Sequence, residues 1–255
     1  MNIIETQNLT KSYADFTAVS NVNLHIPKGA VYGFLGPNGA GKSTTMKMFL
    51  GLTKPTSGSF TIDGKKYPEA RVEILKEVGS FIEAPAFYGN LSGEENLEII
   101  RKILGLPKSS VSEALEIVGL TQFRKRLAKK YSLGMKQRLG LASALIGQPP
   151  ILILDEPESN LDFKNQITVL DVLSKLRDSG ICCIFNTHFP DHAMRIANRA
   201  LLLGDDGRCI CGKTTDIVTE ENIQKTFGVN VKIAEVTSGG RTVKTIVPVS
   251  AADGS

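Results

Sequence analysis

No stretch of the 255-residue sequence is apolar over the roughly 18 residues that a membrane-spanning helix needs. Residues 1–5 also lack the basic and apolar regions of a secretory signal peptide. We therefore expect a cytoplasmic protein that reaches the inner face of the cell membrane only through a partner. A net charge of +4 is too small to indicate nucleic-acid binding by itself.

Cysteines are few and do not have a metal-binding arrangement. Cys182 and Cys183 are adjacent within an apolar run, and Cys209 and Cys211 lie in a glycine-flanked segment that is typical of a hairpin. Neither spacing matches a zinc site, and a cytosolic setting keeps thiols reduced. We expect buried or half-buried free thiols.

One short run, in contrast, carries a phosphate-binding pattern, G-x-x-x-x-G-K-[ST], at every specified position. Glycines in such a loop let backbone N–H groups point at a phosphate, and the following helix adds the positive end of its dipole. Residues 31–35 read as a buried strand and residues 44–50 as a helix, which is the context that the pattern requires. The predicted phosphate-contacting residues are Gly36, Pro37, Asn38, Gly39, Ala40, Gly41, Lys42, Ser43 and Thr44.

Two side chains of this loop have more specific expected roles. Lys42 is expected to reach the outer phosphates of a nucleoside triphosphate, and the Ser43 hydroxyl to bind Mg²⁺. The alternative, a strand-to-helix turn that binds nothing, is disfavoured because both flanks are correct.

Two carboxylates follow a later strand. Residues 151–154 are aliphatic, and Asp155 and Glu156 come directly after them. In P-loop enzymes an acidic residue at that strand end holds Mg²⁺, directly or through water, which is the role expected of Asp155. Glu156 lies one residue further out, where it could orient or deprotonate an attacking water.

The order of apolar runs predicts an α/β protein. Short apolar strands alternate with helices after residue 150, which indicates a mostly parallel sheet buried on both faces. Near the amino terminus, turn signals and alternation predict an antiparallel subdomain over the nucleotide site. Strands are expected at 3–9, 17–26, 31–35, 59–63, 151–154, 181–185 and 200–203, and helices at 44–50, 111–120, 135–146, 163–177 and 191–197.

Residues 85–147 have the character of an inserted helical subdomain. Ser92 and Glu95 form a capping box, and the helix that they open stops before Pro107. A basic cluster at 124–130 is interpreted as a solvated helix face, because no aromatic side chains interleave it. The predicted apolar face of the first helix consists of Leu97, Ile100, Ile103 and Leu104.

A serine and a glycine open a further helix before the strand at 151–154. The serine can cap it, and the free N–H groups of its first turn would favour an anion. Residues 131–138 resemble the signature of ABC transporter ATP-binding subunits, L-S-G-G-Q followed by a K-Q-R-like run. The fit rests on Ser132, Gly134, Gln137 and Arg138, and the departures are Tyr131, Leu133 and Met135.

In that family the anion is the γ-phosphate of ATP held by a second copy, so the resemblance implies two cassettes arranged head to tail. Tyr13 matches the aromatic residue that stacks on adenine, although a strand-surface aromatic is the alternative. Asp162 resembles the aspartate that couples the two cassettes. His188 follows a strand at the place where the family keeps a histidine that contacts the γ-phosphate.

Glu83 departs from the family pattern, which usually has a glutamine here that reaches Mg²⁺ and the membrane partner. An ionised glutamate only accepts hydrogen bonds, and its charge beside Mg²⁺ would tighten ion binding but repel the γ-phosphate. With Phe87, Tyr88 and Leu91, this variant resembles the branch that protects bacteria against lantibiotics and related peptide antibiotics. The alternative is that the change from glutamine to glutamate at position 83 has no functional effect.

Residues 1–225 are therefore expected to form an ABC ATP-binding cassette, with the helical subdomain at about 85–147. Residues 226–255 are expected to be an extension that forms a β-hairpin, since apolar residues alternate around the turn at 238–240. The resemblance implies ATP and Mg²⁺ as cofactors and ATP hydrolysis as the activity. It also implies membrane-spanning permease subunits as partners and an antimicrobial peptide as indirect cargo.

Three other functions can be compared with this sequence. A soluble ABC ATPase acting on ribosomes or DNA usually has two cassettes or long coiled-coil insertions, and this chain has neither. An ABC exporter of another substrate stays open. A GTPase or nucleotide kinase is disfavoured, because no N-K-x-D motif is present and the signature helix would be unexplained.

Overall fold

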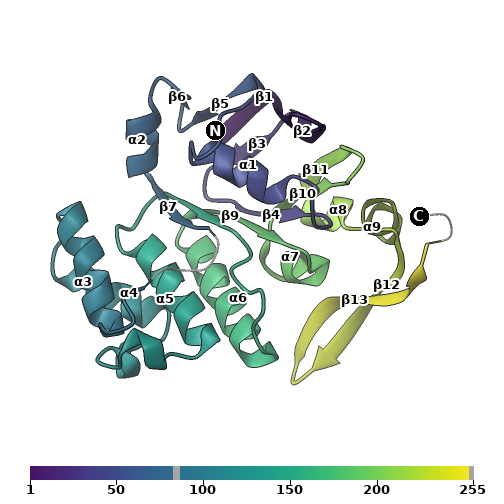
Figure 1. The fold of residues 1–255 in the computed structure, drawn as a ribbon. Coiled ribbons are helices and arrows are strands. Elements are labelled where there is room, and N and C mark those ends of the chain that lie inside the picture. Colours follow the sequence, from purple (N-terminus) through teal and green to yellow (C-terminus); the bar gives the residue numbers. More distant parts are fainter. Residues whose placement is uncertain (83–86, 253–255) are drawn as a thin grey trace.

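The computed structural model describes residues 1–82 and 87–252. Two sheets lie on either side of helix α1 (Lys42–Phe49), with the antiparallel sheet on one side and a mainly parallel sheet on the other (Figure 1). Most of the remaining helices cover the opposite face of the parallel sheet. A two-stranded hairpin projects from one side of the molecule.

The six-stranded sheet carries the strands whose carboxyl ends lead into the predicted site. Its order is β11-β10-β4-β9-β8-β7, and every neighbouring pair is parallel except β10 and β11. β4, β8 and β9 are buried along their whole length because both faces are covered, and the predicted mostly parallel sheet is confirmed. The strands are β4 (Val31–Leu35), β7 (Val78–Phe81), β8 (Ile151–Leu154), β9 (Cys182–Thr187), β10 (Arg199–Leu203) and β11 (Cys209–Lys213).

The antiparallel sheet has the order β2-β1-β5-β6, and β3 pairs with the other end of β1. The single strand expected at 17–26 is wrong, because the chain breaks into β2 and β3. At the break the Thr6 hydroxyl donates to the Val22 carbonyl at 2.7 Å and accepts from the Leu24 N–H at 2.8 Å, so a side chain replaces the ladder. The strands are β1 (Asn2–Tyr13), β2 (Phe16–Val22), β3 (His25–Pro27), β5 (Ser57–Ile62) and β6 (Lys65–Lys66).

The helical part begins with the predicted capping box. The Ser92 hydroxyl accepts from the Glu95 N–H at 3.2 Å, and the Glu95 carboxylate accepts from the Ser92 N–H at 2.7 Å. Short 3₁₀ helices lie at Thr121–Phe123 and Ala128–Lys130. The longer helices are α2 (Arg71–Lys76), which the sequence pattern did not predict, α3 (Gly93–Leu104), α4 (Ser109–Ile117), α5 (Leu133–Leu145), α6 (Phe163–Asp178) and α7 (Pro190–Ile196).

Two expectations for this part are wrong. Ile103 is 77% exposed and Leu104 56%, because the core cluster reaches α3 only through Leu97 and Ile100 of its earlier turns. The basic cluster at 124–130 is largely solvated, as expected, but it is not one helix face. Residues 124–127 form a loop whose carbonyls accept hydrogen bonds from the first N–H groups of α3, and residues 128–130 form the second 3₁₀ helix.

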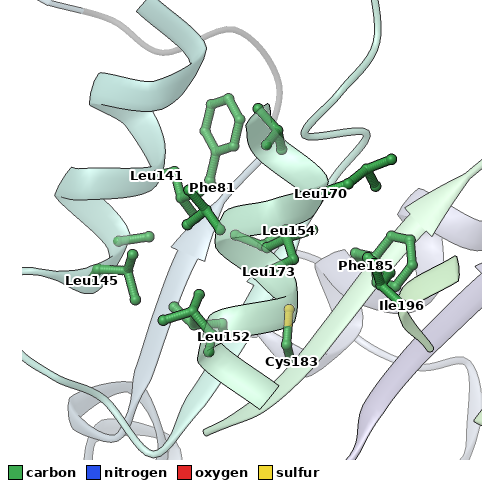
Figure 2. Packing of buried hydrophobic residues seen from close by; sticks show 14 of the residues in the cluster. Phe81, Leu141, Leu145, Leu152, Leu154, Leu170, Leu173, Cys183, Phe185 and Ile196 are labelled. Carbon is green, nitrogen blue, oxygen red and sulfur yellow. The ribbon is translucent and has the colours of Figure 1, made fainter. Parts of the chain in front are cut away.

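The core between the central sheet and the helices is continuous. Figure 2 shows side chains of β7, β8 and β9 packed against those of α5, α6 and α7. This packing fixes the loops that follow the strands, where the site lies. The labelled residues are Phe81, Leu141, Leu145, Leu152, Leu154, Leu170, Leu173, Cys183, Phe185 and Ile196.

The chain continues through α8 (Thr214–Ile217) and α9 (Glu220–Phe227) into the projecting hairpin. This hairpin pairs β12 (Val229–Ser238) with β13 (Arg241–Ala251) across a turn at residues 239–240. The domain boundary expected after residue 225 falls inside α9, which packs on β12. The division into two domains therefore stays a proposal.

The cysteines are all free thiols. Cys182 and Cys183 are buried in β9, and burial raises the pKa of the Cys182 thiol to about 12. The expectation of burial is wrong for Cys211, which is exposed because β11 is the edge strand of its sheet. Within residues 1–82 and 87–252, no helix is long and apolar enough to cross a membrane.

Candidate functional site

The phosphate-binding loop leaves the buried strand β4 and enters α1. Gly36 and Gly41 have φ values of 156° and 91°, and both face other backbone at close range. A Cβ on Gly36 would lie 2.2 Å from the Leu203 carbonyl oxygen, and one on Gly41 would lie 2.1 Å from that of Ala18. These two glycines are therefore required by the packing of the loop as well as by its turns.

Lys42 is the charged group at the centre of the loop. Its side chain is buried, and its Nζ donates to the carbonyls of Gly36 at 2.8 Å and Pro37 at 2.9 Å. Burial lowers the pKa of Lys42, and the nearby carboxylates of Glu156 and Asp155 oppose that shift. A bound anion would favour the charged ammonium in the same way.

Next to Lys42, the hydroxyl group of Ser43 contacts the carboxylate of Asp155. The Ser43 hydroxyl donates to Asp155 Oδ1 at 2.8 Å, and the buried Asn186 donates its amide to both groups. Mg²⁺ is bound through one or two protein oxygen ligands together with substrate phosphates and water. This oxygen pair fits that ion, and a cage of three or more acidic, histidine or cysteine ligands is absent from the described residues.

Glu156 is held from several sides. Its φ of 47° is unusual for a residue other than glycine, and its N–H donates to Asn186 Oδ1. The Ser159 hydroxyl donates to Glu156 Oε2 at 2.9 Å, and His188 Nδ1 lies 3.2 Å from Glu156 Oε1. Both carboxylate oxygens are thus oriented while the side chain is still 32% exposed, so a water molecule can reach it.

An aromatic pair borders the phosphate loop. A cleft of 220 Å³ is lined by Asn38, Gly39, Lys42 and Glu156 among others, and Phe16 lines it too. Tyr13 does not line this cleft but stacks on Phe16, with ring centroids 5.4 Å apart and planes inclined by 26°. The two rings are 43% and 60% exposed, which leaves a stacking surface open at the site.

The signature residues lie apart from this cleft. Ser132 is the exposed N-cap of α5 and accepts from the Met135 N–H at 3.3 Å. Gly134 contacts Asn165, since a Cβ there would lie 2.4 Å from Asn165 Cγ. Asn165 in turn donates to Asp162, the exposed N-cap of α6, and these hydrogen bonds lower the pKa of Asp162. The two segments therefore form one patch, and none of Ser132, Gly134 and Asp162 lines the cleft.

Glu83 was also predicted to belong to the site, and it lies outside the described residues. The structure therefore brings together the phosphate loop, Asp155, Glu156 and His188. It places Tyr13 one ring away from the cleft.

Two residues at the site were missed by the sequence analysis. Asn186 is fully buried and links Ser43, Asp155 and Glu156. A polar residue at the end of an otherwise apolar strand was the available signal. Phe16 had no such signal, because its proximity to the cleft depends on how β2 folds over the loop.

Comparisons with known proteins agree with this geometry. A family model described as ABC transporter matches residues 19–159. The bacitracin transport ATP-binding protein BcrA of Enterococcus faecalis is 46% identical over 198 residues, covering 77% of this chain and 64% of that protein. The lantibiotic transport ATP-binding protein SrtF of Streptococcus pyogenes is 38% identical over 225 residues, covering 88% and 96%.

Solved structures give the same result. The ATP-binding cassette MJ0796, determined as a dimer in a post-hydrolysis state bound to ADP and Pi, superimposes with a TM-score of 0.73 at 27% identity. The match covers 83% of this chain and 98% of that one.

The buried strand, phosphate loop and helix, with acidic residues at a neighbouring strand end, define a P-loop nucleotide-binding protein. The family model spans more than half of the sequence, and the chain belongs to the ABC transporter family as an ATP-binding cassette of the ATPase class. The predicted family and fold class are confirmed. The chain spans less than two thirds of the length of the enterococcal BcrA protein.

Proposed function

We propose that this chain powers a transporter by binding ATP with Mg²⁺ and hydrolysing it between two copies of itself. The observation that carries the proposal is that Lys42, Ser43 and Glu156 line one cleft and that Asp155 accepts a hydrogen bond from Ser43. Phosphoryl transfer depends mainly on positioning and on stabilising charge, and these four side chains are suited to both tasks.

At the phosphate end, backbone N–H groups of the loop and the Lys42 ammonium would bind the phosphate oxygens. Lys42 is buried and pre-oriented by two carbonyls, so it gains an anionic partner without moving far. Ser43 and Asp155 would hold Mg²⁺, which when bound screens phosphate charge and fixes the geometry of the triphosphate. Asn186 keeps these two ligands together.

At the water end, Glu156 would orient the attacking water and accept its proton. Ser159 and His188 hold the two carboxylate oxygens at 2.9 and 3.2 Å, which limits rotation of the side chain. His188 is 34% exposed, so its other ring nitrogen is available to a γ-phosphate. The two residues would act as one unit on the same face of the substrate.

The exposed patch that contains Ser132 and Asp162 supports a second copy as the partner. The N-terminal turn of α5 offers backbone N–H groups and a helix dipole to an anion, yet it is not part of the cleft of its own chain. A head-to-tail pair of cassettes would bring the Ser132 end of one chain against the phosphate loop of the other.

Replacement of the proposed base tests the activity. We expect Glu156→Gln to lower ATP turnover by roughly 10²-fold or more, because the amide cannot accept a proton. ATP binding should persist, and ATP-bound dimers should accumulate on size-exclusion chromatography. Glu73→Gln, an exposed change on α2, serves as the matched control and should hydrolyse ATP normally. Near-normal hydrolysis by Glu156→Gln would remove Glu156 from this role.

We further propose membrane-spanning permease subunits as partners, at the inner face of the cell membrane, and peptide antibiotics as the cargo. Support comes from the relatives, whose names give bacitracin and lantibiotic transport as their functions. Export of another substrate is the competing proposal. Co-purification with permease subunits encoded by neighbouring genes would identify the membrane partner.

Resistance in cells tests the cargo. Cells producing the transporter should resist bacitracin or a lantibiotic, and the hydrolysis-deficient Lys42→Ala chain should abolish that resistance. Glu83→Ala should impair resistance more than ATP binding if Glu83 links the site to the partner. Unchanged resistance in Glu83→Ala would indicate drift at this position, and resistance that does not depend on Lys42 would contradict the proposed cargo.

A further inference from the structure

A second acid–imidazole pair lies beside the proposed catalytic one. Glu156 Oε1 and His188 Nδ1 are 3.2 Å apart, and Glu158 Oε1 and His192 Nδ1 are also 3.2 Å apart. The acids belong to the same loop after β8, and the histidines are four residues apart around the start of α7. The first pair is about one-third exposed, whereas the second has side-chain exposures of 0% for Glu158 and 13% for His192.

The buried pair depends on its internal contact. Glu158 Oε2 has no hydrogen-bond partner in the described part of the chain, and His192 is the side chain that contacts the other oxygen. A buried carboxyl group without a partner is strongly unfavourable, so the His192 contact holds this side chain in place.

One aromatic ring connects the two pairs. The Phe189 ring lies 4.6 Å from the His188 ring and 4.9 Å from the His192 ring, measured between centroids. Phe189 is half-buried and contacts both imidazole rings, so a displacement of His192 would alter the contact that Phe189 makes with His188. Through these ring contacts the buried pair can influence the orientation of the exposed pair.

We propose that Glu158 and His192 are positioning residues for ATP hydrolysis. Their contact joins the loop that carries Glu156 to the helix that follows His188, and Phe189 passes this constraint to the His188 ring. The inference rests on the proposed hydrolytic role of Glu156 and His188. The pair itself touches no substrate.

Imidazole NMR signals provide a test that does not depend on hydrolysis. The chain has three histidines, and the third, His25, is exposed on β3 and serves as an internal reference. Glu158→Ala should shift the His188 ring signals, because Phe189 loses its fixed position, and leave those of His25 unchanged. Asp171→Asn is the control variant. It removes an exposed ion pair between Asp171 of α6 and Arg195 of α7, and it should leave the His188 signals unchanged.

The kinetic test uses the assembled transporter. Glu158→Ala should lower kcat about tenfold, a part of the 10²–10⁴-fold that a positioned acid or base contributes, and leave the KM for ATP within about twofold. His192→Gln, which keeps a hydrogen-bonding side chain, should have a smaller effect. The reciprocal swap, Glu158→His with His192→Glu, should recover kcat because it restores the contact.

The outcomes distinguish failure of the positioning role of Glu158 and His192 from failure of the proposed ATP hydrolysis. Unchanged His188 signals and unchanged kcat in a folded Glu158→Ala chain would overturn the positioning role. A loss of kcat that the swap does not recover, without any His188 shift, would also overturn it. If the wild-type transporter does not hydrolyse ATP, the proposed function fails, and the NMR comparison still decides whether the buried pair sets His188. Should Glu158→Ala not fold, His192→Gln and the swap carry both measurements.

Discussion

Asn186 illustrates how single side chains organise the site. It is fully buried at the end of β9, where its amide nitrogen donates to Ser43 and Asp155 and its carbonyl oxygen accepts from the Glu156 N–H. One residue thus joins the proposed metal ligands to the proposed base. Its hydrogen bonds to Ser43, Asp155 and the Glu156 N–H compensate for the burial of its own polar atoms.

The aromatic pair at the cleft leads to a prediction at the same scale. Phe16 lines the cleft and Tyr13 stacks behind it, so we expect the nucleobase to contact Phe16 directly. The chain contains no tryptophan, so Phe16→Trp and Tyr13→Trp each introduce a single fluorescent reporter. ATP should quench Phe16→Trp more than Tyr13→Trp, and Phe16→Ala should weaken ATP binding about tenfold, as the loss of one base-stacking contact does.

Tripolyphosphate is the control for this measurement, because it occupies the phosphate loop without a base and should leave Phe16→Trp unquenched. Stronger quenching of Tyr13→Trp than of Phe16→Trp by ATP would show that the base lies on Tyr13, as the family resemblance implies.

Among the elements, the start of α3 is held by side-chain contacts in addition to the helix propensity of its residues. Ser92 and Glu95 form the capping box, and Glu94 pairs with Arg124 at 2.7 Å and Lys125 at 3.0 Å. The Arg124 hydrogen bond lowers the pKa of the Glu94 carboxyl group. The helix is thereby fixed to the loop between the two 3₁₀ helices, next to the signature residues.

Loss of the cap tests how much this fixation contributes. Ser92→Ala leaves the Glu95 N–H without its acceptor, and we expect the free energy of unfolding to fall by about 1 kcal/mol in urea titrations. Ser109→Ala is the matched control, because Ser109 is exposed at the start of α4 and should change stability by less than about 0.5 kcal/mol. Equal effects of the two changes would mean that the cap does not anchor the helix.

The whole molecule presents two surfaces that one chain cannot combine. The cleft with Lys42 lies at the phosphate loop, whereas the exposed Ser132 belongs to another patch, together with Asp162. Packing of Gly134 on Asn165 keeps that patch rigid. Closed two-fold pairing of identical chains would place the patch of each chain on the cleft of the other, giving two equivalent sites.

Mixed dimers test this arrangement. Ser132→Arg chains and Lys42→Ala chains should each fail to hydrolyse ATP when alone, since every site of each homodimer carries the same defect. An equal mixture should recover about a quarter of wild-type ATPase activity, because half of the dimers contain one intact composite site. A mixture of Ser132→Arg with Ser132→Arg plus Lys42→Ala is the control and should remain inactive. No recovery in the complementing mixture would contradict a site shared between chains.

Local patterns in the sequence predicted the capping box and the buried strands at 31–35, 151–154 and 181–185, and the structure confirms both. They also predicted a phosphate loop between a strand and a helix and two carboxylates directly after a strand. Each of these features lies in residues that are neighbours along the chain, so spacing and periodicity indicate it. The break between β2 and β3 depends on Thr6, the contact of Asn186 depends on three segments, and Phe16 reaches the cleft only when β2 folds over the loop. These features required the tertiary structure, because they arise from hydrogen bonds and packing between residues distant in sequence.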